Sequence, residues 1–171
     1  YIELEGELGF VDLVTKLIEN NLNAEKLKKH GQKIINTCYV HDDQLIGGTV
    51  ERIKNINIIP SPYLTGALDQ YFHLPLIPMI ETTRGCPFTC TFCADGLDIK
   101  SKINRYDIQR TREELQYIGK NINKVDELIV TDLNFGMYKQ DLETAKEIAK
   151  IQKDYKYPIS VDAPAGKNMP K

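Results

Sequence analysis

The sequence has no apolar run long enough to cross a membrane as a helix. Its longest apolar stretches are short, and one of them, Leu74 to Ile80, is interrupted by Pro75 and Pro78. A membrane-spanning helix needs about 20 consecutive apolar residues, so we expect no membrane partner. The chain begins at Tyr1 without a basic segment and an apolar segment behind it. We therefore expect no signal peptide and interpret the sequence as a fragment of a longer protein.

An excess of charge of one sign is also missing. The 22 Lys and Arg residues nearly balance the 24 Asp and Glu residues, which gives a formal net charge of −2. Such a chain has no overall basic field to attract nucleic acid or an anionic membrane surface, so we expect neither. With 42% hydrophobic and 27% charged residues in 171, the composition is that of a globular protein. The length predicts one domain plus a remnant of another, or part of one larger domain.

Cysteine is scarce, and its placement is informative. Of the four cysteines, Cys38 stands alone, whereas Cys86, Cys90 and Cys93 form a C-x3-C-x2-C pattern. A disulfide framework normally spreads an even number of cysteines over a small secreted domain, and three thiols this close cannot all pair. The pattern instead favours a metal ion or cluster in a reducing compartment, for which we expect the cytoplasm.

Residues 1–59 and 76–171 differ in rhythm, and a proline-marked linker over 60–75 separates them. In the first region the pattern predicts a helix over 8–18, a short helix capped by Asn23 and ending at Lys29, and a hairpin with arms over 33–40 and 45–53. In the second region it predicts strands over 76–82, 127–131 and 158–161 with helices over 107–120 and 140–155. Strands that alternate with helices indicate an α/β fold with a parallel sheet or barrel.

The loop that carries the three cysteines follows the first of these strands. A [4Fe–4S] cube offers four iron positions to ligands, so three thiolates leave one iron open to a substrate or cofactor. Gly85 and Pro87 keep the loop out of a regular helix and allow its thiols to converge. Because the carboxyl ends of barrel strands carry the chemistry in this class of fold, the loop is expected at the active rim.

The three cysteines are also compatible with a zinc site, with buried unreactive thiols and with a closed electron-transfer cluster. Zinc would take His73 or Cys38 as a fourth ligand, but His73 lies 13 residues upstream and no second C-x2-C pair exists. An electron carrier would need a fourth Cys or His near the loop, and none is present. A zinc-stabilised interaction module and a non-catalytic iron–sulfur electron carrier are therefore kept as alternative functions.

The segment Cys86-Pro-Phe-Thr-Cys90-Thr-Phe-Cys93, preceded by Glu-Thr-Thr-Arg-Gly, resembles the cluster motif of the radical S-adenosylmethionine (radical SAM) enzymes. The resemblance implies a [4Fe–4S] cluster held by Cys86, Cys90 and Cys93, with S-adenosylmethionine on the open iron. One electron from the cluster then cleaves the sulfonium and yields a 5′-deoxyadenosyl radical, which abstracts hydrogen from a substrate. The cofactors supply this chemistry, and the protein supplies position and exclusion of water.

The resemblance also suggests which side chains contact S-adenosylmethionine. Phe92 matches the aromatic position that lies against the adenine in this family. In this family the end of the second barrel strand contacts the amino group of the cofactor, and in this sequence Asp132 and Asn134 offer oxygen acceptors at that position. The family's Gly-Gly-Glu segment is missing, and Asp132 is an equally good residue for a turn or cap of the loop.

The flanks resemble the subclass that contains a cobalamin-binding domain. Glu3-Leu-Glu-Gly-Glu7 with the following helix resembles the end of such a domain, and residues 59–66 resemble its linker to the barrel. The implied fold is the first part of a partial (β/α) barrel, preceded by the end of a Rossmann-like cobalamin-binding domain and a hairpin. The implied cofactors are the [4Fe–4S] cluster and S-adenosylmethionine, with cobalamin in the full-length parent. The implied partners are an electron donor, such as a flavodoxin or ferredoxin, and an unknown substrate.

Overall fold

A computed structural model describes residues 1–166 and divides the chain into two compact units. The first unit is Tyr1–Lys54, and the second begins at Asn55. The domain expected over 76–171 therefore includes five positions, 167–171, that lie outside the described residues. Within residues 1–166, no helix is long and apolar enough to cross a lipid bilayer.

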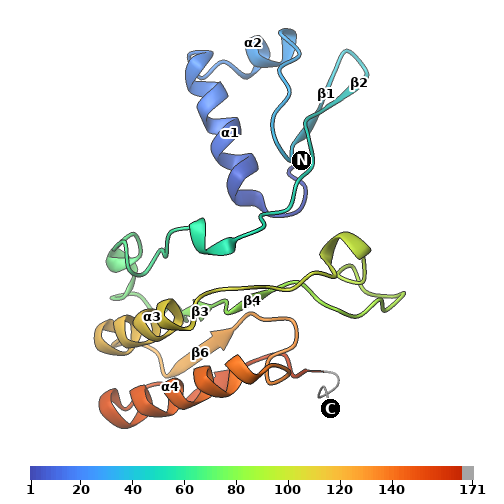
Figure 1. Ribbon diagram of the computed structural model, residues 1–171. Coiled ribbons are helices and arrows are strands. Elements are labelled where there is room, and N and C mark those ends of the chain that lie inside the picture. Colours follow the sequence, from blue (N-terminus) through green and yellow to red (C-terminus); the bar gives the residue numbers. More distant parts are fainter. Residues whose placement is uncertain (167–171) are drawn as a thin grey trace. The chain divides into compact units, whose positions relative to one another are not determined.

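The first unit contains two helices and one hairpin (Figure 1): α1 Gly6–Glu19, α2 Ala24–Lys29, β1 Cys38–His41 and β2 Gln44–Gly47. The two helices expected from the sequence are confirmed. The Asn23 side chain accepts a hydrogen bond from the Lys26 N–H at 2.9 Å, as its predicted cap role requires. Asp42 and Asp43 both have positive φ, 48° and 56°, which is the backbone of a tight two-residue hairpin turn.

The hairpin arms are shorter than the sequence suggested, and Asn36 is the reason. This residue has a left-handed backbone, with φ of 50°, which interrupts the first arm before Cys38. Its buried side chain bonds the backbone of Glu51 twice: Nδ2 donates to the Glu51 carbonyl at 2.8 Å, and Oδ1 accepts from the Glu51 N–H at 2.7 Å. The side-chain amide therefore adds two hydrogen bonds to the backbone bonds of this part of the unit, where the Asn36 N–H also donates to the Thr49 carbonyl at 2.9 Å.

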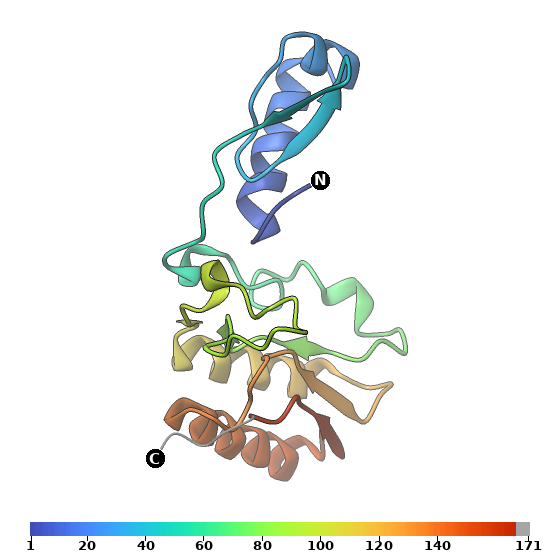
Figure 2. The ribbon, with the colours of Figure 1, turned by 90° about the vertical axis from the view of Figure 1, so that its right-hand side faces the viewer.

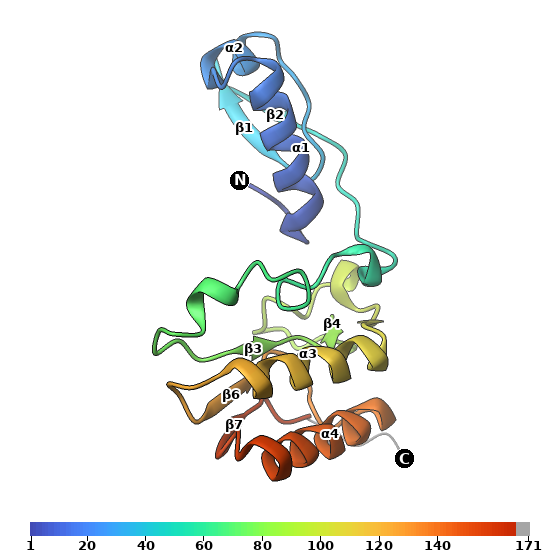
Figure 3. The same cartoon turned by 90° about the vertical axis from the view of Figure 1, so that its left-hand side faces the viewer.

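The second unit is built on a three-stranded parallel sheet in the order β3-β6-β7, with strands Met79–Ile80, Glu127–Val130 and Ser160–Asp162. Figures 2 and 3 show the sheet from its two sides, with both helices, α3 Ile108–Asn121 and α4 Lys139–Tyr155, on one face. The α/β class and the alternation of strands and helices are thus confirmed. Short 3-10 helices, Ile56–Ile58, Asp69–Tyr71 and Asp98–Lys100, lie in the connections.

The core of the second unit lies between the sheet and its two helices. The sheet contributes Ile80 from β3 and Leu128 and Val130 from β6. The helices contribute Leu115 and Ile118 from α3 and Ile148 and Ile151 from α4, and Tyr63 and Tyr157 complete the core. The tyrosine hydroxyls donate to backbone carbonyls, Tyr63 to Met79 at 2.8 Å and Tyr157 to Glu127 at 2.7 Å. These contacts hold the amino ends of β3 and β6, whereas the candidate site is built from their carboxyl ends.

The strand expected over 76–82 is much shorter in the structure. Pro78 has no N–H for a ladder, so the strand begins only at Met79. Beyond Ile80 the chain turns and forms a second small sheet, in which β4 Thr83–Arg84 pairs antiparallel with β5 Asn104–Arg105. The sequence did not predict this pair, which places both ends of the cysteine loop side by side.

Candidate functional site

The cysteine loop lies between β4 and β5, and its ends are held together by the pairing of Thr83 with Arg105 and of Arg84 with Asn104. Figure 1 shows the loop extending beyond the ends of the strands. It follows β3 at the carboxyl edge of the parallel sheet. The expected position of the loop at this edge is therefore confirmed.

The start of the loop requires glycine. Gly85 has a φ of 113°, and a Cβ there would lie 2.6 Å from the Lys102 carbonyl oxygen and 2.9 Å from that of Lys100. The next residue, Cys86, donates its backbone N–H to the Lys100 oxygen at 3.1 Å. Gly85 thus lets two backbone segments approach closely, and this approach fixes the backbone of the first cysteine.

The second and third cysteines lie on consecutive turns. The Cys93 N–H donates to the Cys90 carbonyl at 3.1 Å, and the Gly96 N–H donates to the Cys93 carbonyl at 3.0 Å. A Cβ at Gly96 would lie 2.5 Å from the Cys90 oxygen, so the turns close tightly only because this residue has no side chain.

None of the four cysteines is in a disulfide; Cys86 is buried, and Cys90 and Cys93 are half-buried. Three thiols within eight residues are a donor set that suits an iron–sulfur cluster with one open position. Their side chains are not gathered, however: among residues 1–166, no three His, Cys, Asp or Glu side chains lie close enough together to hold a metal ion. The donor chemistry fits the predicted cluster, while cluster binding itself stays a prediction.

Phe92 is 89% exposed and lies between the second and third cysteines of the motif. Its ring therefore offers its apolar surface to a planar group that enters the site. The predicted contact with an adenine stays a prediction.

Asp132, directly after β6, is buried and 1% exposed. Its carboxylate accepts hydrogen bonds from the Thr82 N–H at 2.6 Å, from the Thr82 hydroxyl and from the Thr83 hydroxyl at 3.0 Å. Burial raises the pKa of this carboxyl group, although the hydrogen bonds from both threonines act in the opposite direction. The sequence left two roles open for Asp132, contact with the cofactor and a structural role in the loop. This geometry favours the structural role, because Asp132 ties the end of β6 to the segment between β3 and β4.

Asn134 is the predicted site residue that the structure brings next to a cysteine. The side chain is 3% exposed, and its Nδ2 donates to the Cys86 Sγ at 3.3 Å. Its Oδ1 is buried and has no hydrogen-bond partner among the described residues. A buried acceptor without a donor costs free energy, so this oxygen marks a place where a donor from a bound molecule fits.

Asp141 is a positioning residue that the sequence did not reveal. Its Oδ2 accepts from the Gly136 N–H at 2.8 Å and from the Tyr138 N–H at 2.9 Å, which fixes the loop that contains Asn134. The only signal in the sequence is an acidic residue in the first turn of a helix, where backbone N–H groups need acceptors. The same loop is held against the chain after β7, because the Phe135 N–H donates to the Pro164 carbonyl at 2.9 Å.

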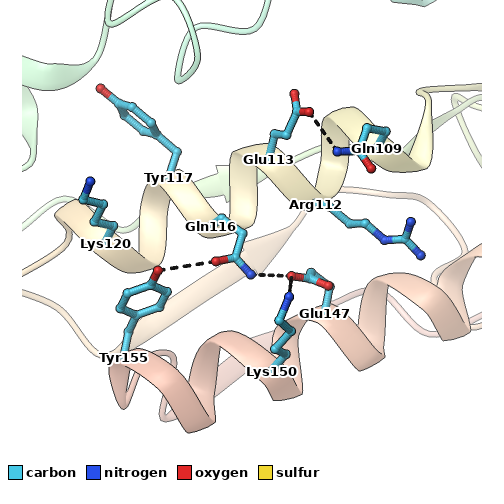
Figure 4. A pocket seen from close by; sticks show the side chains of 9 residues that line it. All are labelled: Gln109, Arg112, Glu113, Gln116, Tyr117, Lys120, Glu147, Lys150 and Tyr155. Atoms are coloured by element: carbon cyan, nitrogen blue, oxygen red, sulfur yellow. Dashed lines mark hydrogen bonds and ion pairs between the residues drawn. The ribbon is translucent and has the colours of Figure 1, made fainter.

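Two surface cavities of the second unit lie outside the cysteine loop. One is a groove of about 500 Å³ between α3 and α4. Figure 4 shows its lining side chains, among which Gln116 bonds Glu147 and the charged Arg112 and Lys120 extend from α3. An apolar pocket of about 480 Å³ is lined by residues of the 62–79 segment, including Tyr63 and Phe72. Neither is lined by a cysteine, by Asp132 or by Asn134.

Comparison with known proteins identifies methyltransferases as relatives, one of them a radical SAM enzyme. The chain is 29% identical over 155 residues to the 2-(S-pantetheinyl)-carbapenam-3-carboxylate methyltransferase of Streptantibioticus cattleyicolor, covering 85% of this chain and 21% of the relative. It is 29% identical over 132 residues to the cobalamin-dependent radical SAM methyltransferase TokK of Streptomyces tokunonensis, covering 74% and 19%. The chain thus spans about one fifth of the length of these relatives. No family model matches the sequence.

The fold agrees with solved structures of a similar kind. The cobalamin-dependent S-adenosylmethionine radical enzyme OxsB, in the structure with aqua-cobalamin and S-adenosylmethionine bound, superposes with a TM-score of 0.55 at 24% identity. This match covers 87% of the present chain and 20% of the other. The structure with aqua-cobalamin alone gives a TM-score of 0.59 at 22% identity and covers 92% and 21%. The chain is therefore similar in sequence to methyltransferases, among them a cobalamin-dependent radical SAM enzyme, and it shares the fold of OxsB over the matched part.

Proposed function

We propose that this chain carries the cluster-binding segment of a radical SAM enzyme. In this proposal Cys86, Cys90 and Cys93 hold a [4Fe–4S] cluster at the start of a partial (β/α) barrel. The main supporting observation is the set of three thiols on one closed loop at the carboxyl edge of the sheet. The similarity to TokK supports the same assignment.

The three cysteines occupy two kinds of structural setting. Cys86 has a fixed backbone and a buried sulfur, so it supplies a preformed anchor. Cys90 and Cys93 lie half-buried on short turns, and in this proposal their thiolates complete the set of three ligands. When bound and reduced, the cluster supplies the electron that cleaves S-adenosylmethionine.

Two side chains are proposed to receive S-adenosylmethionine. The unpartnered Oδ1 of Asn134 accepts from the ammonium group of its methionine part, because a buried amide oxygen gains a charge-assisted hydrogen bond there. The exposed ring of Phe92 lies against the adenine and excludes water from one side of it. Asp132 holds the strand end behind them through Thr82 and Thr83.

For the whole protein we propose a cobalamin-dependent methyl transfer to an unidentified substrate. Its support is the methyltransferase function of the relatives, each of which is about five times as long as the part matched here. The first unit is proposed to be the end of a Rossmann-like cobalamin-binding domain. An electron donor of the flavodoxin or ferredoxin type would reduce the cluster, and four cysteines outside disulfides fit a cytoplasmic location.

The test of the proposal is anaerobic reconstitution with iron and sulfide. The chain should become brown and contain about four irons, as one cubane requires. Replacing any of Cys86, Cys90 or Cys93 with Ala should remove most of the iron, whereas Cys38→Ala is the matched control and should keep it. Addition of S-adenosylmethionine should change the electron paramagnetic resonance spectrum of the reduced cluster. A stable colourless form with one zinc ion would overturn the proposal in favour of a zinc module, and an unchanged spectrum would favour an electron carrier.

A further inference from the structure

The hydrogen bond between Asn134 and Cys86 joins two groups that have separate tasks in the proposed function. Nδ2 of Asn134 donates to the sulfur of Cys86 at 3.3 Å, and both residues are only 3% exposed. The two residues are 48 positions apart in the sequence and come from the ends of different segments at the same sheet edge. The contact is therefore made by the fold and not by the local chain.

The donor is held in place independently of the sulfur. Asp141 fixes the loop around Asn134 through the N–H groups of Gly136 and Tyr138. The backbone on the other side is fixed as well, because Cys86 donates to the Lys100 carbonyl. The amide therefore points at the sulfur before any ligand arrives, and the hydrogen bond does not need to be formed anew when a cluster binds.

A hydrogen bond to a thiolate sulfur matters most when the cluster carries more negative charge. Reduction adds one electron to the cluster, and a nearby N–H dipole stabilises the added charge, particularly where burial lowers the local dielectric. Donors of this kind raise the reduction potential of iron–sulfur clusters. Cys86 is the most buried of the three proposed ligands, so a donor at this sulfur is the least screened by water.

We propose that Asn134 is a positioning residue that sets the reduction potential of the cluster through Cys86, and that its other atom, Oδ1, receives the S-adenosylmethionine ammonium. This inference rests on the proposed function and adds a regulatory link to it. A single planar amide then contacts the cluster ligand with its nitrogen and the cofactor with its oxygen. Binding of the cofactor polarises the amide, strengthens its N–H donor and makes reduction easier when the cofactor is present.

The experiment compares the reconstituted full chain with Asn134→Ala and Asn134→Asp by redox titration, monitored by electron paramagnetic resonance. Both variants lose the N–H donor, so both potentials should become more negative than that of the unmodified chain. We expect a change of at least about threefold in the equilibrium constant for reduction, which is about 28 mV for a one-electron couple. The Asp variant should show the larger change, because it also places a negative charge near the sulfur.

The two variants also separate the donor from the acceptor. Asn134→Asp keeps an oxygen for the ammonium, so the spectral change on addition of S-adenosylmethionine should persist. Asn134→Ala has no such oxygen and should lose most of that change. The matched control is Asn20→Ala, which removes an equally buried amide, 4% exposed, in the first unit and should leave both potential and spectrum unchanged.

The contact itself is tested without iron by a double-mutant cycle. Unfolding of the cluster-free chain, of Asn134→Ala, of Cys86→Ala and of the double variant should show a non-zero coupling between the two sites. Zero coupling, or a potential that is the same in all variants with a cluster present, overturns this inference and leaves the proposed function intact. Failure of the unmodified chain to take up a cluster overturns the proposed function, and this inference falls with it.

Discussion

The Asp132 side chain stabilises the backbone at the start of the cysteine loop. Its carboxylate accepts from the backbone and the hydroxyl of Thr82 and from the hydroxyl of Thr83. These donors lie where β3 ends and β4 begins, a few residues before Cys86. Loss of the carboxylate leaves several buried donors without an acceptor at the point where the cysteine loop starts.

Asp132→Ala should therefore lower the free energy of unfolding by about 2 to 3 kcal/mol, because unsatisfied buried donors cost about 1 to 3 kcal/mol. Urea unfolding followed by circular dichroism measures this change. The control is Asp126→Ala, at an exposed position before β6, which should change the free energy by less than about 0.5 kcal/mol. Equal effects of the two substitutions would show that the threonine contacts contribute nothing.

Gly85 and Gly136 provide a second matched pair at this scale. Both have positive φ, 113° and 87°, but a Cβ at Gly85 would meet backbone oxygens whereas a Cβ at Gly136 would meet nothing within 4 Å. Gly136→Ala should cost about 1 kcal/mol of backbone strain, and Gly85→Ala should cost at least about 2 kcal/mol because the backbone at Lys102 must also move. Thermal unfolding of both variants checks the order, which the reverse ranking would contradict.

The sequence predicted the candidate site residues only where neighbouring positions in the chain carry the signal. The spacing of three cysteines within eight residues predicts a donor set for a cluster, which stays a prediction, and the structure places the predicted Asn134 next to Cys86. The choice between two roles for Asp132 depended on Thr82, 50 residues away, which no local pattern connects to it. The unpartnered oxygen of Asn134 is likewise a property of three-dimensional packing.

At the scale of elements, helices were predicted better than strands. The apolar repeat of α3 and α4 spans 14 and 17 residues, long enough for a clear 3.6-residue period. β3, β4 and β5 have only two residues each, too few for an alternating pattern. Pairing between β4 and β5 is set by contacts across the loop, so it was missed.

The middle of α1 is tied to the segment before β1 by Asp12, whose carboxylate accepts from the Lys16 ammonium at 2.5 Å and from the Ile35 N–H at 2.8 Å. Burial alone would raise the pKa of Asp12, but the hydrogen bonds from Lys16 and Ile35 outweigh it and hold the pKa below its usual 3.8. A carboxyl group with a lowered folded-state pKa adds stability above its unfolded-state pKa. This stability is lost as the pH falls through the folded-state value.

Asp12→Asn should accordingly be less stable than the unmodified chain at pH 7, by no more than about 1 kcal/mol because solvent screens this partly exposed pair. The difference should shrink below about pH 4 and vanish once Asp12 is protonated in both states. Urea unfolding at a series of pH values measures it. A difference that does not change with pH would show that shape, rather than charge, accounts for the effect.

At the scale of the whole molecule, the two units separate the proposed cofactor site from the rest of the described chain. All three cysteines of the motif and Asn134 belong to the second unit, which begins at Asn55. The buried Asn36, with two hydrogen bonds to Glu51, belongs to the first. A destabilising substitution in the first unit is therefore expected to leave cluster binding by the second unit unchanged.

Asn36→Ala tests this independence. Loss of both hydrogen bonds should lower the stability of the first unit by about 2 kcal/mol. Hydrogen exchange should rise in residues 1–54 and not in α3 or α4, and the iron content after reconstitution should equal that of the unmodified chain. A fall in iron content that parallels the loss of stability would show that the two units fold as one.

The pairing of β4 with β5 has a consequence for how readily a cluster is taken up. Because Thr83 pairs with Arg105, the two ends of the segment that carries the thiols are held together, and the segment is a closed loop. Closing a flexible loop costs conformational entropy, and here that cost is met during folding. The thiols are thus confined at a high effective concentration relative to one another. Once one thiolate has captured iron, the other two are held on the same closed loop and have less conformational space to search before they reach the cluster.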